Sequence, residues 1–92
     1  MVIESDSQKR DVTEAILAKL HFAVVPVDSV ERALSITKAL RPSVIVCEEV
    51  DEARVRTDLN APEVAVVAMV DEPDALLERI RLAIRARVIP IA

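Results

Sequence analysis

The sequence predicts an α/β fold built on an open parallel sheet of five strands in the order 2-1-3-4-5. Short apolar runs rich in Val and Ile alternate with longer segments whose apolar residues recur at helical spacing. This alternation is typical of right-handed β-α-β crossovers, which make the strands parallel. One of the runs contains Pro26, which cannot donate a hydrogen bond within a sheet. Its strand is therefore placed at an edge of the sheet, as that order requires of strand two.

The first half of the chain is expected to supply three strands and two helices. A Ser-x-x-Gln capping box at Ser5 predicts the start of the first helix, and Pro42 ends the second. The chain contains no glycine, so His21 is expected to take the left-handed conformation that ends the first helix. The expected strands are residues 1–4, 22–27 and 44–47, and the expected helices are residues 7–20 and 29–41. The predicted buried stripes are Val12, Ile16, Leu17 and Leu20 in the first helix and Val30, Ala33, Leu34, Thr37 and Leu40 in the second.

In the second half of the chain, one segment gives a weak secondary-structure signal and the others give clear ones. Residues 49–60 are polar and short, so they are expected to form at most one or two helical turns, a reduced third helix. Residues 64–70 are a continuous apolar run, typical of a central strand. Pro73 marks the start of a last helix that ends near residue 86, and residues 88–91 are expected to form the fifth strand.

Composition narrows the possible function. Ninety-two residues fit one domain, 1–92, and 12 basic against 16 acidic residues give a net charge of −4. That charge argues against nonspecific binding to nucleic acid or to an anionic membrane. No stretch approaches the roughly 20 apolar residues of a membrane span, so no membrane insertion and a cytoplasmic location are expected. The lone cysteine, Cys47, lies in an apolar run and is interpreted as a small buried hydrophobe.

Four segments together resemble the receiver domain of response regulators, a flavodoxin-like family. The resemblance lies in their order and spacing: a strand that runs into acids, an Arg-Pro-x-aliphatic run that ends in an acid, a second buried strand, and a last strand with a proline. These segments are residues 2–10, 41–48, 66–70 and 88–91. The resemblance covers nearly the whole chain.

The resemblance implies roles for the acids at the carboxyl ends of the strands. Glu48 stands at the phosphoacceptor position, but its carboxylate lies one methylene further out than the family's aspartate. Glu4 matches the first member of the family's Mg²⁺-binding acid pair, Ser5 falls where the second acid is usual, and Asp6 is the acid that could compensate. Neither a Mg²⁺ cofactor nor another metal site is therefore expected.

Two further positions depart from the family in a way that affects phosphorylation. Val70 stands where the family has its switch hydroxyl, and Ile91 stands where it has a lysine. Holding a phosphoryl group requires a cation and a hydrogen-bond donor, which neither residue provides. We therefore expect a pseudo-receiver and not an enzyme. It is expected to mediate protein–protein interaction or dimerisation in bacterial signal transduction or protein localisation, as one module of a larger protein. The alternative is a degenerate receiver that accepts phosphate on an acid at this edge.

Two surfaces are candidates for a protein partner or a homodimer. The family has a fifth helix that this chain lacks, so half of one sheet face is expected to be bare; the alternative interpretation is a chain cut before that helix. The second surface is the arginine-bearing end of the chain, because arginine is enriched at interfaces and pairs with carboxylates. Its residues are Arg79, Arg81, Arg85, Arg87, Ile89 and Ile91. A small-ligand or enzyme reading is disfavoured because the chain has no glycine-rich phosphate loop.

Overall fold

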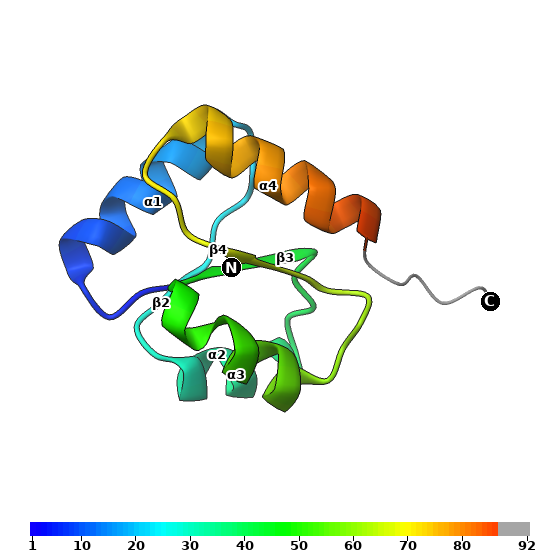
Figure 1. The fold of residues 1–92 in the computed structure, drawn as a ribbon. Coiled ribbons are helices and arrows are strands. Elements are labelled where there is room, and N and C mark those ends of the chain that lie inside the picture. The colour runs from blue at the N-terminus through cyan, green and yellow to red at the C-terminus, as the bar shows by residue number, and fades with distance from the viewer. Residues whose placement is uncertain (87–92) are drawn as a thin grey trace.

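The computed structural model describes residues 1–86, which form three layers. A parallel sheet with strand order β2-β1-β3-β4 lies in the middle, with helices on both of its faces (Figure 1). The strands are β1 (Val2–Ile3), β2 (Pro26–Val27), β3 (Val44–Cys47) and β4 (Ala65–Ala68). The helices are α1 (Ser7–Lys19), α2 (Val30–Thr37), α3 (Glu49–Leu59) and α4 (Pro73–Ala86). The α/β class, the parallel pairing and the edge position of Pro26 are confirmed, and the expected fifth strand, residues 88–91, lies outside the described residues.

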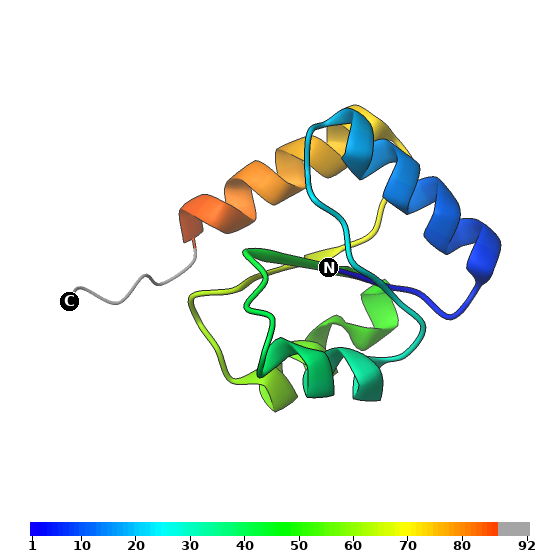
Figure 2. The same ribbon diagram turned by 180° about the vertical axis from the view of Figure 1, so that it is seen from behind.

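Both faces of the sheet are covered. Helices α1 and α4 lie on one face and α2 and α3 on the other, as Figures 1 and 2 show from opposite sides. Val46 of β3 belongs to the core beneath α1 and α4, together with Leu76 and Ile80 of α4. Ile45 belongs to the core beneath α2 and α3, together with Val55 of α3. The expectation of a half-bare face is therefore wrong.

The reason lies in the position of α4. A right-handed crossover that carries the chain from β4 to a parallel neighbour on its outer side needs its helix on the face of α2 and α3. Helix α4 instead lies on the face of α1, with Leu76 and Ile80 almost fully buried there. It takes the place that the five-stranded architecture gives to the helix after its last strand. Periodicity predicts that α4 has a buried stripe, but it does not say which face of the sheet that stripe covers.

Two segments are shorter than expected. Strand β2 contains only Pro26 and Val27, because Phe22 and Val24 leave the sheet and pack against the core beneath α1 and α4. Helix α2 ends at Thr37, and the last residue of its predicted stripe, Leu40, is 42% exposed. The predicted limits of both elements are therefore wrong by several residues.

The predicted stripe of α1 also differs from the structure. Val12 is 55% exposed, and its neighbour Thr13 is buried instead. The Thr13 hydroxyl donates to the Lys9 carbonyl at 2.9 Å, which satisfies its polar group inside the fold. Leu17 is buried as predicted. No helix in residues 1–86 has the length and apolarity needed to span a bilayer.

His21 ends α1 in the left-handed conformation, with φ of 66°, as the sequence predicted. The His21 amide donates to the Ala18 carbonyl at 3.1 Å, and the Phe22 amide donates to the Leu17 carbonyl at 3.0 Å. This pair of bonds is a Schellman motif. Asn60 also takes the left-handed conformation, with φ of 47°, where α3 ends, and its amide donates to the Arg56 carbonyl.

Helix α3 is longer than the one or two turns expected, with 11 residues. Three acids in its first turn interact favourably with the positive end of the helix dipole. Arg56 pairs with Glu52 at 2.7 Å, and Arg54 pairs with Asp58 at 3.5 Å, both at i,i+4 spacing. Val55 is the buried residue of this helix, and Leu59 at its end is partly buried against the same core, so few apolar contacts attach a largely polar helix to the sheet.

Candidate functional site

The carboxyl ends of β1 and β3 bring two glutamates together. Ile3 pairs with Cys47 in the parallel register, so the residues that follow them, Glu4 and Glu48, leave the sheet side by side. Glu4 is only 7% exposed, and Glu48 is half-buried. In open parallel sheets this edge carries the ligand sites. The pair is therefore the candidate functional site.

Backbone contacts hold Glu4 in place. The Glu4 amide donates to the Val27 carbonyl of β2 at 3.0 Å, and Arg10 of α1 donates from Nη1 to the Glu4 carbonyl at 2.8 Å. The Glu4 carboxylate accepts a hydrogen bond from the Ser5 amide at 3.0 Å. These contacts fix the residue between the edge strand and the first helix.

The environment of Glu4 raises the pKa of its carboxyl above the ordinary value of 4.5. Burial is the largest cause, followed by the hydrogen bond and the negative charge of Glu48. The Ser5 amide and the positive charge of Lys9 act in the opposite direction, but more weakly. A raised pKa means that the fold favours the protonated form of Glu4, in which it can donate a hydrogen bond to Glu48.

The space beneath the pair is small. A cavity of about 10 Å³ is lined by Glu4, Glu48, Thr13 and Met69, among others. Such a volume holds roughly one water molecule. The Thr13 hydroxyl lies 3.4 Å from the Met69 sulfur across the same region.

The other acid expected at this site serves a different purpose. Asp6 is the N-cap of α1, where its Oδ1 accepts from the Gln8 amide at 2.9 Å and the Lys9 amide at 3.1 Å. Ser5 is exposed beside it. Asp6 is therefore engaged in capping the helix and does not complete an acid pair with Glu4. Within residues 1–86, no three His, Cys, Asp or Glu side chains are grouped so that they could hold a metal.

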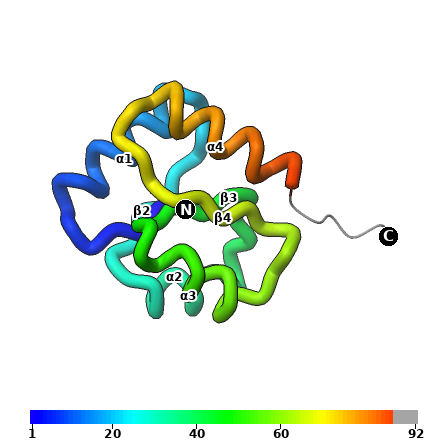
Figure 3. The backbone as a smooth tube through the Cα atoms, viewed as in Figure 1, coloured from blue at the N-terminus to red at the C-terminus, as the bar shows by residue number. Residues whose placement is uncertain are grey.

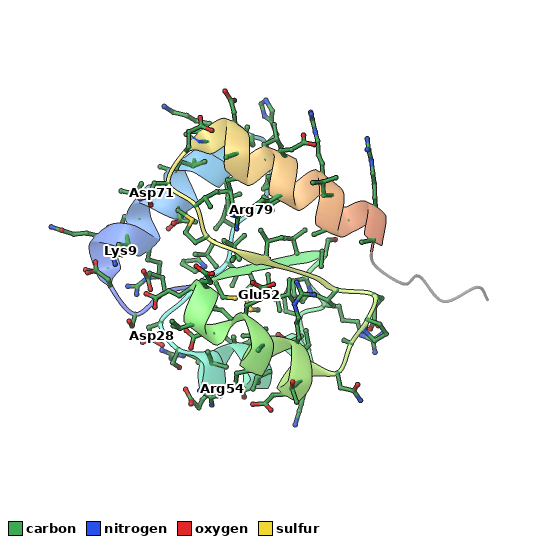
Figure 4. The ribbon with its side chains drawn as sticks, in the orientation of Figure 1. Lys9, Asp28, Glu52, Arg54, Asp71 and Arg79 are labelled. Atoms are coloured by element: carbon green, nitrogen blue, oxygen red, sulfur yellow. The ribbon has the colours of Figure 1, made fainter. Side chains whose placement is uncertain are left out.

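The remaining predicted positions lie apart from the acid pair. Val70 is half-buried and packs against the core beneath α1 and α4. Arg79, Arg81 and Arg85 are exposed on α4, whose position over the sheet is visible in Figure 4. The other members of that predicted surface, Arg87, Ile89 and Ile91, lie outside the described residues.

Cys47 precedes Glu48 and is 1% exposed. Burial, followed by the negative charges of nearby acids, raises the pKa of its thiol to about 12. The thiol is thus protonated at neutral pH and is not a nucleophile. Its interpretation as a buried hydrophobe is confirmed.

Sequence reasoning missed two arginines that contact backbone carbonyls. Arg10 donates to Glu4, and Arg56 of α3 donates from Nη2 to the Val66 carbonyl at 2.8 Å. The i,i+4 spacing from Glu52 predicts the ion pair of Arg56, but no sequence signal points to its backbone acceptor.

Comparisons of the chain with family models, curated proteins and solved structures found no match.

Proposed function

We propose that this chain is a pseudo-receiver: a module that binds another protein, in bacterial signal transduction or protein localisation, without being phosphorylated. The observation that carries the first half of the proposal is the contact between Glu4 and Glu48. A phosphoryl group at this edge would bring further negative charge to a buried carboxyl and its neighbour. Receiver-like chemistry needs a cation to neutralise that charge and a donor to bind the transferred group.

The neighbouring groups support this reading. Arg10 is directed to the Glu4 carbonyl, Asp6 is occupied by the start of α1, and Val70 cannot donate a hydrogen bond. Burial and the neighbouring Glu48 raise the pKa of Glu4, so the ionised form of this carboxyl is disfavoured where further negative charge would have to bind. The acid pair thus acts as a structural pair of groups in the edge of the sheet.

The exposed arginines of α4 are the favoured docking surface. A homodimer through a bare sheet face does not fit the structure, because α4 covers that face. Arg81 and Arg85 are four residues apart and project on the same side of the helix. Arginine binds carboxylates through two parallel hydrogen bonds, so an acidic protein surface is the partner that these residues fit.

Phosphorylation is tested by intact-mass spectrometry after incubation with a small phosphodonor and Mg²⁺. We expect the mass of this chain to stay unchanged under conditions that fully label an ordinary receiver, which serves as the positive control. A gain of one phosphoryl group that disappears in Glu48→Gln would support the alternative, a degenerate receiver that is still phosphorylated.

The docking surface on α4 is tested separately. Binding to an acidic partner should be lost in Arg81→Glu and kept in the control variant, Arg32→Glu of α2.

A further inference from the structure

Helix α3 is attached to the fold by little apolar burial. It lies beside α2 on the face of the sheet opposite α1 and α4 (Figure 3). In its 11 residues only Val55 is buried and Leu59 is partly buried, whereas α2 buries three residues in eight. Val50, in the first turn of α3, is 84% exposed. Burial therefore holds α3 to the sheet more weakly than it holds the neighbouring helix.

The start of α3 lacks a side-chain cap. The N-cap residue, Glu48, makes no capping hydrogen bond with its side chain. The side chains of Asp6 and Ser29 cap α1 and α2, and the Glu72 carboxylate accepts from the Ala75 amide at the start of α4. A missing cap leaves the first amides of a helix to water and lowers the stability of the helix. The first turn of α3 is therefore without a contact that stabilises the start of each of the other three helices of residues 1–86.

Two arginines connect α3 to its neighbours. Arg56 donates from Nη2 to the Val66 carbonyl of β4 at 2.8 Å, and its ion pair with Glu52 orients the guanidinium. Arg54 pairs with Glu31 of α2. The side chains of Arg54 and Arg56 are 48% and 55% exposed, so both connections are made at the surface. Ion pairs in such positions contribute little to stability and weaken as salt is added.

We propose that α3 is a movable helix, which leaves the sheet as a unit while the rest of the domain stays folded. Arg56 is the latch that holds this helix in its closed position. Opening withdraws Val55 from the core and uncovers apolar side chains of that core, which include Ile45 and Val66. The other core stays intact, because it lies on the opposite face of the sheet, beneath α1 and α4. The closed and open forms therefore differ in the position of one helix.

The movable helix begins at the candidate functional site. Glu48 directly precedes α3, and its carbonyl accepts from the Asp51 amide at 2.9 Å. Opening of α3 breaks this contact and releases Glu48 from the position that places it beside Glu4. A ligand that holds Glu48 in place would therefore favour the closed form. The inference does not rest on the proposed function, since it uses neither phosphorylation nor the arginines of α4.

Native-state amide hydrogen exchange tests the proposal on the full chain. Protection, corrected for the exchange rates of the unfolded chain, is compared between residues 53–58 of α3 and residues 77–83 of α4. In the wild type we expect the α3 amides to be less protected by about tenfold or more. Ile80→Val should lower the α4 protection by about fivefold and leave the α3 protection unchanged, since Ile80 stays buried when α3 opens. Equal protection of the two helices in the wild type, or an equal fall in both helices in Ile80→Val, would overturn the proposal.

Arg56→Met tests the latch. This variant keeps an apolar stem and removes the guanidinium, so the protection of the α3 amides should fall by about fivefold. The control is Arg32→Met in α2, whose ion pair with Asp28 does not connect α2 to another helix. The control should leave the α3 protection unchanged. Unchanged α3 protection in Arg56→Met would refute the role of Arg56; if that variant does not fold, the wild type and Ile80→Val still decide whether α3 opens as a unit.

Discussion

Val55 offers the sharpest test of how α3 is attached to the sheet. Its side chain is 0% exposed, whereas Val50 in the same helix is 84% exposed. Substituting alanine at each position removes the same two methyl groups. The pair of variants therefore separates the effect of burial from the effect of the substitution itself.

The expected magnitudes follow from burial. Two methyl groups taken from a buried site cost about 1.6 kcal/mol of transfer free energy, and a cavity that closes only in part adds roughly 1 kcal/mol. Alanine's higher helix propensity offsets about 0.5 kcal/mol at either position. We therefore expect Val55→Ala to lose about 2 kcal/mol of unfolding free energy and Val50→Ala to gain up to about 0.5 kcal/mol.

Urea unfolding followed by far-UV circular dichroism measures both variants, since the chain has neither Trp nor Tyr for fluorescence. The midpoint should fall clearly in Val55→Ala and stay level or rise in Val50→Ala, with the same slope for both. Equal midpoints would mean that α3 does not bury Val55 against the sheet, and the reasoning about this helix would be refuted.

Three further predictions concern single residues. Because the folded pKa of Glu4 lies above its ordinary 4.5, its stabilising contribution is complete below that value and is lost as pH rises through the folded pKa. Glu4→Gln should therefore weaken the decline of stability above pH 4.5, as measured by thermal melts over a pH series; an unchanged decline would contradict this. Cys47 should not react with a thiol reagent until the chain is unfolded by urea, and rapid labelling of the native protein would show that the thiol is accessible. His21→Gly should raise the unfolding free energy by about 0.5–1 kcal/mol, since glycine avoids the steric cost of the left-handed conformation. The control, Ala18→Gly inside α1, should lower it by about 1 kcal/mol. Changes of the same sign in denaturant melts of the two variants would refute the assignment of His21.

The fold class followed from the sequence because its strongest signals are local. The apolar runs around Ile45 and Val66 could only be buried strands, and Pro26 placed its own strand at an edge. The face covered by α4 did not follow, because a helical stripe is satisfied equally by either side of a sheet. Helix α3 was underestimated for a related reason: its turns are supported by ion pairs and by one buried residue, Val55, and not by an apolar stripe.

The position of the candidate site could be predicted from the sequence, but the contacts that its side chains make could be predicted only in part. Glu4 and Glu48 had to meet once β1 and β3 were neighbours in a parallel sheet. The use of Asp6 as a helix cap competed with its use as a pocket acid, and the sequence contains signals for both. The contacts of Arg10 and Arg56 with backbone carbonyls depend on how helices lie against strands, which only the three-dimensional arrangement determines.

The most direct test of the account is the titration of the Glu4 carboxyl, followed by carbon-13 NMR of its side chain. We predict that Glu4 titrates above its ordinary value of 4.5 and that Glu48→Gln, which removes the neighbouring negative charge, moves the titration down toward that value. A Glu4 that titrates at or below 4.5, with no response to Glu48→Gln, would contradict the claim that burial and the neighbouring Glu48 raise the pKa of Glu4 at this edge of the sheet.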